Sequence, residues 1–448
     1  MYPWKEALSS WSESQLRIDA LGLITILGTE EVNTSVGRLV RSRYVEFLPL
    51  LGAFVLPSNQ FTKKQPNFVL YNLTDGIATT EVAGWLSRWL KAQDFHQVHH
   101  KIRWEAREPS TSVSPQTWTA LMISIPVNGI LLALPVLSGD WWGFANVLAM
   151  TMSIFVRVVL VGQNRAGIDN AIKETTTESV KEESDIAVNQ PPTTNQEKVE
   201  QLAKVLVIMD DSKVVTMMVP RNLVRPVFTR APKVPNVRFY RFVRWVGWVA
   251  FTAHIVSIGM ASLSTQIFTV ILIVLSTILT AFKFGCDDWR MMTLISRQSA
   301  GENEHEQAGV SCLISSRLKA TCSEYPKRYD RWIQNVSQGK TAQAGGSDLE
   351  TTSSESPVRQ QRERLADPEA QGHNVDSAAV DDSPGTPRTE RRRDLFIWLE
   401  LTEDELDLLK AWGLVPQEKN SRWWDEFNRM RKLWKPEKRG TVTGPRAN

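Results

Sequence analysis

The sequence predicts an α-helical integral membrane protein in which four transmembrane helices form two hairpins, with small cytosolic α+β parts and a disordered C-terminal region. Three observations lead to this prediction. Four windows of about 20 residues are almost wholly apolar, which is the length that crosses a bilayer as a helix. Lysine and arginine gather on one side of these windows. A long stretch near the C-terminus contains no aromatic residue and is dominated by polar and charged residues, glycine and proline.

The four apolar windows pair into two hairpins. The first two windows are joined by the sequence SGD and the last two by ST. Links this short force each pair to return to the side from which it came, and helices are expected because a backbone in lipid must satisfy its own hydrogen bonds. The predicted spans are 118–137 and 142–161 in hairpin 1 (118–161), and 245–263 and 266–284 in hairpin 2 (245–284).

Basic residues near the ends of the spans set the expected orientation, because lysine and arginine favour the cytosolic side. The segment 219–244 has seven basic residues and no acidic one, whereas the two short turns carry neither lysine nor arginine. These topology-determining residues are Arg221, Arg225, Arg230, Lys233, Arg238, Arg241 and Arg244. We therefore expect a multi-pass membrane protein with its N- and C-termini and its central loop in the cytosol. Spans of about 20 residues do not distinguish the plasma membrane from an endomembrane.

Two further expectations concern processing. The sequence MYPWKEALSSWSESQ has no continuous apolar core, so we expect no cleaved signal peptide. Asn33, Asn72 and Asn335 each begin the glycosylation acceptor pattern. A cytosolic location predicts that none of these three asparagines carries sugar.

The N-terminal region, 1–110, is predicted to be folded and cytosolic. The segment 67–76 resembles a strand that ends in an Asp-Gly turn. An amphipathic helix is expected to follow it, with Thr79 or Thr80 as N-cap and its apolar face formed by Val82, Trp85, Leu86, Trp89 and Leu90. Two apolar runs, 16–28 and 45–57, are too short to span a bilayer. They are expected to pack within this region or to lie on the membrane surface, and a re-entrant pair is the alternative.

The central loop divides into a flexible linker at 162–203 and a folded segment at 204–240. The linker is expected because 171–200 is polar and lacks aromatic residues. The folded segment begins with two β-branched runs, Lys204–Met209 and Val214–Val219, around a polar turn, which predicts a β-hairpin followed by the basic juxtamembrane residues. Both runs are apolar on both faces, so both faces should be covered. An isolated hairpin is marginal in water, and we expect the strand within 67–76 to pair with it.

Three regions follow the second hairpin. A partly helical juxtamembrane region is expected at 285–336 and a disordered region at 337–393. Residues 394–437 form a helical tryptophan-rich module, in which Thr402 and Glu405 match a capping box and Gly413 marks a helix end. This module can dock on the rest of the chain, bind a partner or lie on an anionic leaflet. Its docking residues are expected to be Trp412, Trp423, Trp424, Phe427 and Trp434.

No known catalytic motif occurs: there is no glycine-rich phosphate loop, nucleophile elbow or metalloprotease helix. Clustered acids or histidines occur at His96, His99 and His100, at Asp210 and Asp211, and at Asp287 and Asp288. Solvated or turn roles are favoured for all of them over metal binding, since no further ligand lies nearby. The three cysteines give no disulfide framework. We therefore expect no enzyme, no cofactor, no metal and no nucleic-acid partner.

Polar residues within the predicted spans are the remaining candidates. Asn128 lies near the centre of the first span and His254 near the centre of the third. Two alternatives stay open: a hydrogen bond that joins the helices, or a lining role in a solute or proton path. The small residues Ala253, Ser257 and Ala261 predict close helix packing within one bundle or between two copies. Arg157, about one turn from the end of the second span, is expected to extend to the interface.

The segments KVLVIMDDSKVVTMMVPRNLVRPVF, VGWVAFTAHIVSIGMASLSTQIFTVILIVLSTI and WLELTEDELDLLKAWGLVP…RWW resemble uncharacterised multi-pass membrane proteins of filamentous fungi. The resemblance covers the two hairpins, the loop between them and the C-terminal module. It implies a fungal membrane protein with cytosolic ends and implies no activity.

These observations predict a non-enzymatic membrane scaffold or regulatory subunit that contacts the lipid bilayer, binds a protein partner on the cytosolic side and can form a homo-oligomer. The alternative is a small-solute or ion transporter or channel subunit, with a path near His254 and Asn128.

Overall fold

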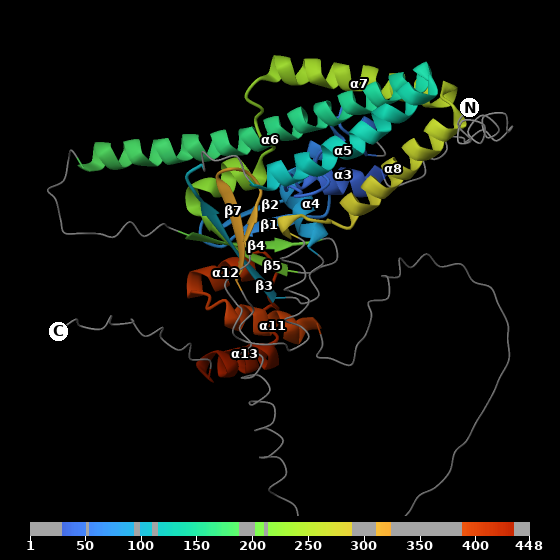
Figure 1. The fold of residues 1–448 in the computed structure, drawn as a ribbon. Coiled ribbons are helices and arrows are strands. Elements are labelled where there is room, and N and C mark those ends of the chain that lie inside the picture. Colours follow the sequence, from blue (N-terminus) through green and yellow to red (C-terminus); the bar gives the residue numbers. More distant parts are fainter. Residues whose placement is uncertain are drawn as a thin grey trace, which may run out of the picture. The chain divides into compact units, whose positions relative to one another are not determined.

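The structure is a computed structural model that describes residues 29–50, 53–93, 99–109, 115–187, 202–209, 214–288, 311–323 and 388–433. The chain forms two compact units (Figure 1). The first unit comprises Met1–Glu324 together with Thr402–Val415, and the second comprises Tyr325–Leu401 together with Pro416–Asn448. Almost all elements that the sequence places in or beside the membrane belong to the first unit.

Four helices within the described residues are long and apolar enough to cross a membrane. They are α5 (Pro115–Ser138), α6 (Trp141–Ala187), α7 (Val237–Met260) and α8 (Leu263–Ala281). The number and the order of these helices confirm the expectation of four apolar helices in two pairs. The helix α7 begins eight residues before the predicted start at 245, because the Asn236 side chain accepts a hydrogen bond from the backbone N–H of Phe239 and caps the helix there.

The turns of the two hairpins are joined by one carboxylate. Asp140, between α5 and α6, accepts hydrogen bonds at 2.8 Å from the backbone N–H groups of Gly143 and Ser262 and at 3.0 Å from the hydroxyl of Thr265. Partial burial alone would raise the pKa of Asp140, but these hydrogen bonds outweigh it and lower the pKa. Asp140 therefore satisfies free N–H groups at the starts of both α6 and α8.

The helix α6 corrects the prediction of a flexible linker at 162–203. It continues without interruption to Ala187, and the strand β4 (Leu202–Ile208) begins beyond it. Ile168 and Ile172 belong to the main hydrophobic core, and they lie at helical spacing from Val161. Asn164 donates a hydrogen bond to the hydroxyl of Tyr240 on α7 at 3.2 Å. The apolar stripe explains why this part of the segment folds although its composition is polar.

A seven-stranded mixed sheet takes its strands from three parts of the chain. The strands β1 (Val69–Asn72), β2 (Ile77–Thr79) and β3 (His99–Ala106) precede α5. The strands β4 and β5 (Val214–Pro220) lie between α6 and α7, and β6 (Ser311–Leu313) and β7 (Leu318–Ser323) follow α8. The order across the sheet is β2-β1-β4-β5-β3-β7-β6, in which β3 and β5 are parallel and the other neighbours are antiparallel.

The predicted hairpin and its predicted partner are both present. The strands β4 and β5 pair antiparallel, and β1 pairs with β4, with Tyr71 opposite Leu206. The turn residues Asp210 and Asp211 lie outside the described residues. The hairpin occupies the middle of the sheet, so its backbone is paired on both edges.

Both faces of the hairpin are covered, as its apolar pattern predicts. On one face, alternate side chains such as Val205 and Met217 join a core that includes Trp85, Trp89 and Trp104. The ring centroids of Trp89 and Trp104 lie 5.2 Å apart, an edge-to-face contact. On the other face lies α12 (Glu403–Ala411): Lys204 pairs with Glu405 at 3.1 Å, and the rings of Tyr71 and Trp412 are 5.1 Å apart.

The rest of the N-terminal region consists of short elements. They are α3 (Thr29–Gly37), the 3-10 turns η1 (Ala53–Val55) and η2 (Gln60–Thr62), and α4 (Gly84–Ala92). The predicted face of the amphipathic helix is buried, but its start differs. Ala83 occupies the N-cap, because Thr79 is the last residue of β2. After β5 the chain forms η3 (Arg221–Leu223) and a π-helical turn, η4 (Val224–Thr229).

The C-terminal module at 394–437 is divided between the two units. The helix α12 belongs to the first unit, whereas α11 (Arg388–Trp398) and α13 (Ser421–Leu433) belong to the second. The predicted capping box of Thr402 and Glu405 is present, and Gly413 has the left-handed φ of +67° that ends a helix. The predicted disordered region 337–393 lies outside the described residues as far as 387, and α11 occupies its last six positions.

Within the region 285–336, which was expected to be partly helical, residues 311–323 form two strands. After α8 the chain turns at Gly285, and β6 and β7 add an edge to the sheet beside β3. In β7 the buried residues Leu318 and Ala320 alternate with the less buried Lys319 and Thr321, which is the period of a strand. The rest of the region, 289–310 and 324–336, lies outside the described residues.

Candidate functional site

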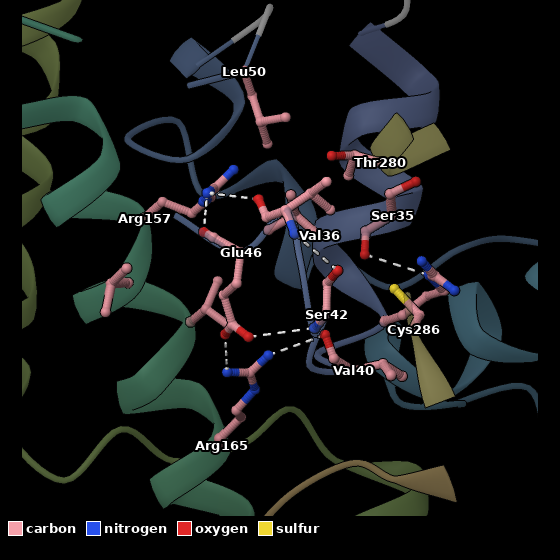
Figure 2. A pocket seen from close by; sticks show the side chains of 14 residues that line it. Ser35, Val36, Val40, Ser42, Glu46, Leu50, Arg157, Arg165, Thr280 and Cys286 are labelled. Atoms are coloured by element: carbon pink, nitrogen blue, oxygen red, sulfur yellow. Dashed lines mark hydrogen bonds and ion pairs between the residues drawn. The ribbon is translucent and has the colours of Figure 1, made fainter. Parts of the chain in front are cut away.

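A half-open cavity lies where the N-terminal segment 35–50 meets α6 and the end of α8 (Figure 2). Three arginines line it: Arg38, which directly follows α3, and Arg157 and Arg165 from α6. The two α6 arginines are eight residues apart and so lie on one side of the helix, about 12 Å apart along its axis. The cavity thus brings three arginine side chains together beside the candidate spans.

Arg165 is held by the segment that it faces. Its guanidinium donates to the carboxylate of Glu46 at 2.6 Å and to the backbone carbonyls of Leu39 at 2.6 Å and Val40 at 3.0 Å. Glu46 also accepts from the backbone N–H of Ser42 at 3.3 Å. Arg165 therefore anchors the segment on α6, and its charge is balanced by Glu46.

Arg157 has different hydrogen-bond partners from Arg165. Its side chain does not extend to the interface, contrary to the prediction from the sequence. Its side chain is buried, with 7% of the residue exposed. It donates to the backbone carbonyls of Glu46 and, at 3.4 Å, of Val45. Among the described residues, no carboxylate forms an ion pair with it. The physical reason is that the segment 39–48 covers this side of α6, so the guanidinium meets carbonyl groups before it reaches water.

Arg38 and Asp288 form a buried ion pair at the other side of the cavity. Burial alone would lower the pKa of Arg38, but the Asp288 carboxylate outweighs it, and the pKa is raised. Gln93 also donates to Asp288, at 3.4 Å. Arg38 follows α3 and Asp288 follows α8. Their ion pair therefore joins two parts of the chain that are 250 residues apart in the sequence.

Cys286 lines the cavity beside Arg38. Burial and then the neighbouring Asp288 raise the pKa of this thiol to about 11. The thiol is therefore protonated at neutral pH, which disfavours nucleophilic or redox chemistry. The cavity offers guanidinium donors and one buried thiol, a combination suited to binding an anion more than to acid–base catalysis.

The segment 45–57 lies against the candidate spans. Ser124 on α5 donates to the backbone carbonyl of Phe47 at 2.7 Å. Arg244 on α7 donates to the carbonyl of Pro57 at 2.7 Å, and the rings of Phe54 and Phe251 lie 5.6 Å apart. Val55 and Leu56 belong to the main hydrophobic core, which fits packing with the N-terminal region, one of the three arrangements expected for this run. The other run, 16–28, lies outside the described residues.

The structure does not bring the two predicted intramembrane polar residues together. Asn128 donates to the hydroxyl and carbonyl of Ser124, at 2.8 and 2.9 Å, and to the carbonyl of Phe47 at 3.4 Å. The Nδ1 atom of His254 is buried and has no hydrogen-bond partner among the described residues. The expected bond between the two helices is replaced by one between α5 and the segment 45–57.

The small-residue stripe on α7 is not one continuous contact face. Ser257 and Ala261 are buried, but Ala253 is exposed. The Ser257 hydroxyl donates to the carbonyl of Ala253 at 2.6 Å, within the same helix. The buried polar contact between helices comes instead from Asn146 on α6 and Thr269 on α8, which are 3.1 Å apart.

The seven basic residues at 221–244 fall into two groups. Arg221 pairs with Asp75 at 2.5 Å, and Arg244 holds Pro57. The others are exposed around the start of α7: Arg225, Arg230, Lys233, Arg238 and Arg241. These five side chains are exposed near the start of α7. Basic residues at such a position beside a membrane span would contact lipid headgroups.

The aromatic residues predicted to dock lie in both compact units. Trp412 contacts Tyr71 in the first unit. In the second unit, the rings of Trp423 and Phe427 stack at 5.2 Å, and Trp424 lies edge-on to both. Trp434 lies outside the described residues. Trp412 thus packs within the first unit. The face of α13 that holds Trp423 and Phe427 is buried within the second unit.

The described residues include only some of the side chains considered as metal ligands. His96, Asp210 and Asp211 lie outside the described residues, whereas His99 and His100 begin β3. Asp288 is committed to Arg38. Among the described residues, no group of three or more histidine, cysteine or acidic side chains lies close enough to hold a metal ion.

Comparisons of this chain with protein-family models, with curated proteins and with solved structures find no match. The resemblance to fungal membrane proteins stays a prediction.

Proposed function

We propose that this chain is a multi-pass membrane protein that holds one cytosolic sheet domain against the membrane and acts as a non-enzymatic scaffold or regulatory subunit. The single observation behind the proposal is the origin of the sheet. Its strands come from before α5, from between α6 and α7, and from after α8. A continuous sheet requires all three segments on one side of the membrane, and two helical hairpins satisfy this requirement.

The charge distribution supports the cytosol as that side. The exposed basic residues around the start of α7, such as Arg238 and Arg241, lie where that helix leaves the sheet. The turn that contains Asp140 carries no basic residue. Lysine and arginine concentrate on the cytosolic ends of spans, so the sheet faces the cytosol and the Asp140 turn faces away from it.

The packing of the sheet domain and the exposed charge of the second unit fit a scaffold role. The sheet core is packed with large side chains such as Trp85 and Trp104, and the buried arginines bind carbonyls or carboxylates of the chain itself. The second unit presents exposed basic side chains on α13: Arg422, Arg429 and Lys432. An acidic surface of a cytosolic partner protein is the complementary ligand.

The alternative, a solute or proton path past His254 and Asn128, has one supporting observation. The unpartnered Nδ1 of His254 is the kind of polar atom that such a path would use. Asn128, however, is occupied by Ser124 and Phe47, which favours a packing role for it.

Proximity labelling in cells that express the full chain separates these two functions. A stop codon after Val415 removes α13 and keeps α12 on the sheet. The matched control is the double variant His254→Ala and Asn128→Ala, which leaves α13 intact. The scaffold proposal expects one enriched cytosolic complex that is lost on truncation and kept in the control. Retention of the complex after truncation, or loss of solute flux in the double variant with correct membrane insertion, would contradict it.

A further inference from the structure

We infer that the arginine-lined cavity binds the phosphate of an anionic lipid headgroup, taken from the leaflet on the side of the sheet. The inference rests on the proposed crossing of the membrane by α6. It does not depend on which compartment the sheet faces.

The first argument is charge. Three guanidiniums line the cavity, from Arg38, Arg157 and Arg165. Two carboxylates are bonded to them: Asp288 to Arg38 and Glu46 to Arg165. Arg157 is left with backbone carbonyls among the described residues, so one positive charge is not neutralised by an ion pair. Burial of such a charge is costly, and an oxyanion bound beside it would remove that cost.

The second argument is geometry. Arg157 faces the cavity from α6, and the hydroxyl-bearing side chains of Ser42 and Thr280 line it from two other elements (Figure 2). The Ser42 and Thr280 hydroxyls already donate to the backbone carbonyls of Phe284 and Ser276. The guanidinium of Arg157 is therefore the donor that phosphate oxygens would accept from. The cavity has a volume of about 50 Å³, where one water molecule needs about 10–15 Å³. It therefore has room for a small group such as a phosphate, and not for a large solute.

The third argument is depth. The predicted end of the second span at 161 lies midway between Arg157 and Arg165, so the Cα atoms of the two arginines lie about 6 Å on either side of the predicted edge of the hydrocarbon core. Headgroups occupy a layer of this thickness beyond the core. A lipid phosphate therefore reaches the cavity without leaving its normal depth.

The fourth argument separates a lipid from a free anion. Part of the cavity wall is apolar and is formed by Val45, Leu50, Val158 and Val161. A free phosphate would face this wall with unsatisfied oxygens, whereas a lipid places its glycerol and the first carbons of its chains there. The mixed lining thus fits a lipid better than an inorganic ion.

The test is native mass spectrometry of the purified full-length protein in detergent, titrated with phosphatidic acid and, separately, with phosphatidylcholine. We expect preferential binding of phosphatidic acid, and affinity about tenfold weaker or worse in Arg157→Gln, because one charge-assisted contact is lost. Lys173→Gln is the matched control: it removes one exposed charge from the same helix, outside the cavity, and should bind as the wild type does. Equal binding by Arg157→Gln and the wild type would overturn the inference.

Two further measurements keep the test decisive. Inorganic phosphate is added as a competitor, and displacement at concentrations equal to those of the lipid would show a free-anion site and overturn the lipid assignment. If Arg157→Gln does not fold, a photoreactive phosphatidic acid is used on the wild type. Adducts should then fall on 45–50 and 158–161, and adducts confined to the exposed face of α7 would refute the cavity as the site.

Discussion

The carboxylate of Asp140 accepts a hydrogen bond from the backbone N–H of Ser262, with 2.8 Å between Oδ2 and N. This contact joins the turn of one helical pair to the turn of the other. The same carboxylate accepts from Gly143 and Thr265, so one side chain caps two helices. The two hairpins are thus held together at the ends farthest from the sheet by a single residue.

Replacement of Asp140 by alanine is expected to lower the free energy of unfolding by about 1–3 kcal/mol, because each lost N-cap costs about 0.5–2 kcal/mol. Asp140→Asn retains a cap acceptor and should cost less than the alanine variant. Thermal unfolding of the purified chain in detergent measures both changes. Equal stability of the alanine variant and the wild type would show that this contact contributes nothing.

The lowered pKa of Asp140 gives the difference between wild type and Asp140→Asn a pH dependence. A carboxyl group whose pKa is lowered by folding stabilises the protein above its unfolded pKa, about 3.9, and that contribution disappears as pH falls through the folded pKa. We expect the unfolding midpoint of the wild type to exceed that of Asp140→Asn at neutral pH. The gap should close below about pH 4. A gap that widens on acidification would contradict the hydrogen-bond pattern.

The buried pair of Arg38 and Asp288 should be far more sensitive than an exposed pair. Asp288→Asn leaves Arg38 buried without its carboxylate, and breaking a buried pair in this way costs about 3–5 kcal/mol. The matched control is Glu81→Gln, since Glu81 pairs with Lys64 on the surface at 3.2 Å and such pairs are worth about 0–1 kcal/mol. Chemical unfolding measures both variants, and similar losses in the two would mean that Asp288 is not buried against Arg38.

The helical extension of α6 is tested at Ile168. Because its side chain is part of the core, Ile168→Ala should destabilise the protein by about 2–5 kcal/mol. Lys173→Ala lies on the exposed side of the same helix and should change stability by less than about 0.5 kcal/mol. Hydrogen exchange provides a second readout, since backbone amides at 162–175 should be protected. Rapid exchange there would restore the interpretation of this segment as a linker.

Several elements could be predicted from the sequence because their signals are local. The four apolar helices follow from length and composition, and the β4–β5 hairpin follows from two β-branched runs around a polar turn. The need for cover on both faces of that hairpin follows from the absence of alternation, and the core with Trp85 and Trp89 covers one face while α12 covers the other. The capping box of Thr402 and Glu405 is likewise a local pattern.

Other features depend on contacts that no local pattern encodes. Arg38 and Asp288 meet across most of the chain, so the cavity between α3, α6 and α8 cannot be read from either segment alone. The end of α6 was hidden by its polar composition, although Val161, Ile168 and Ile172 form a helical stripe that would have revealed it. The division of the C-terminal module depends on the docking of Trp412 beside Tyr71, a tertiary contact.

The central claim is that every strand-bearing segment lies on one side of the membrane and the Asp140 turn on the other. Glycosylation mapping in cells tests it directly, with a long acceptor-bearing insert placed after Gly139 in one variant and after Thr177 in another. We expect sugar on the insert after Gly139, none on the insert after Thr177, and none on the native acceptor asparagines Asn33 and Asn72. Sugar at Asn72 or on the Thr177 insert, or an unmodified Gly139 insert in a correctly inserted protein, would contradict the claim.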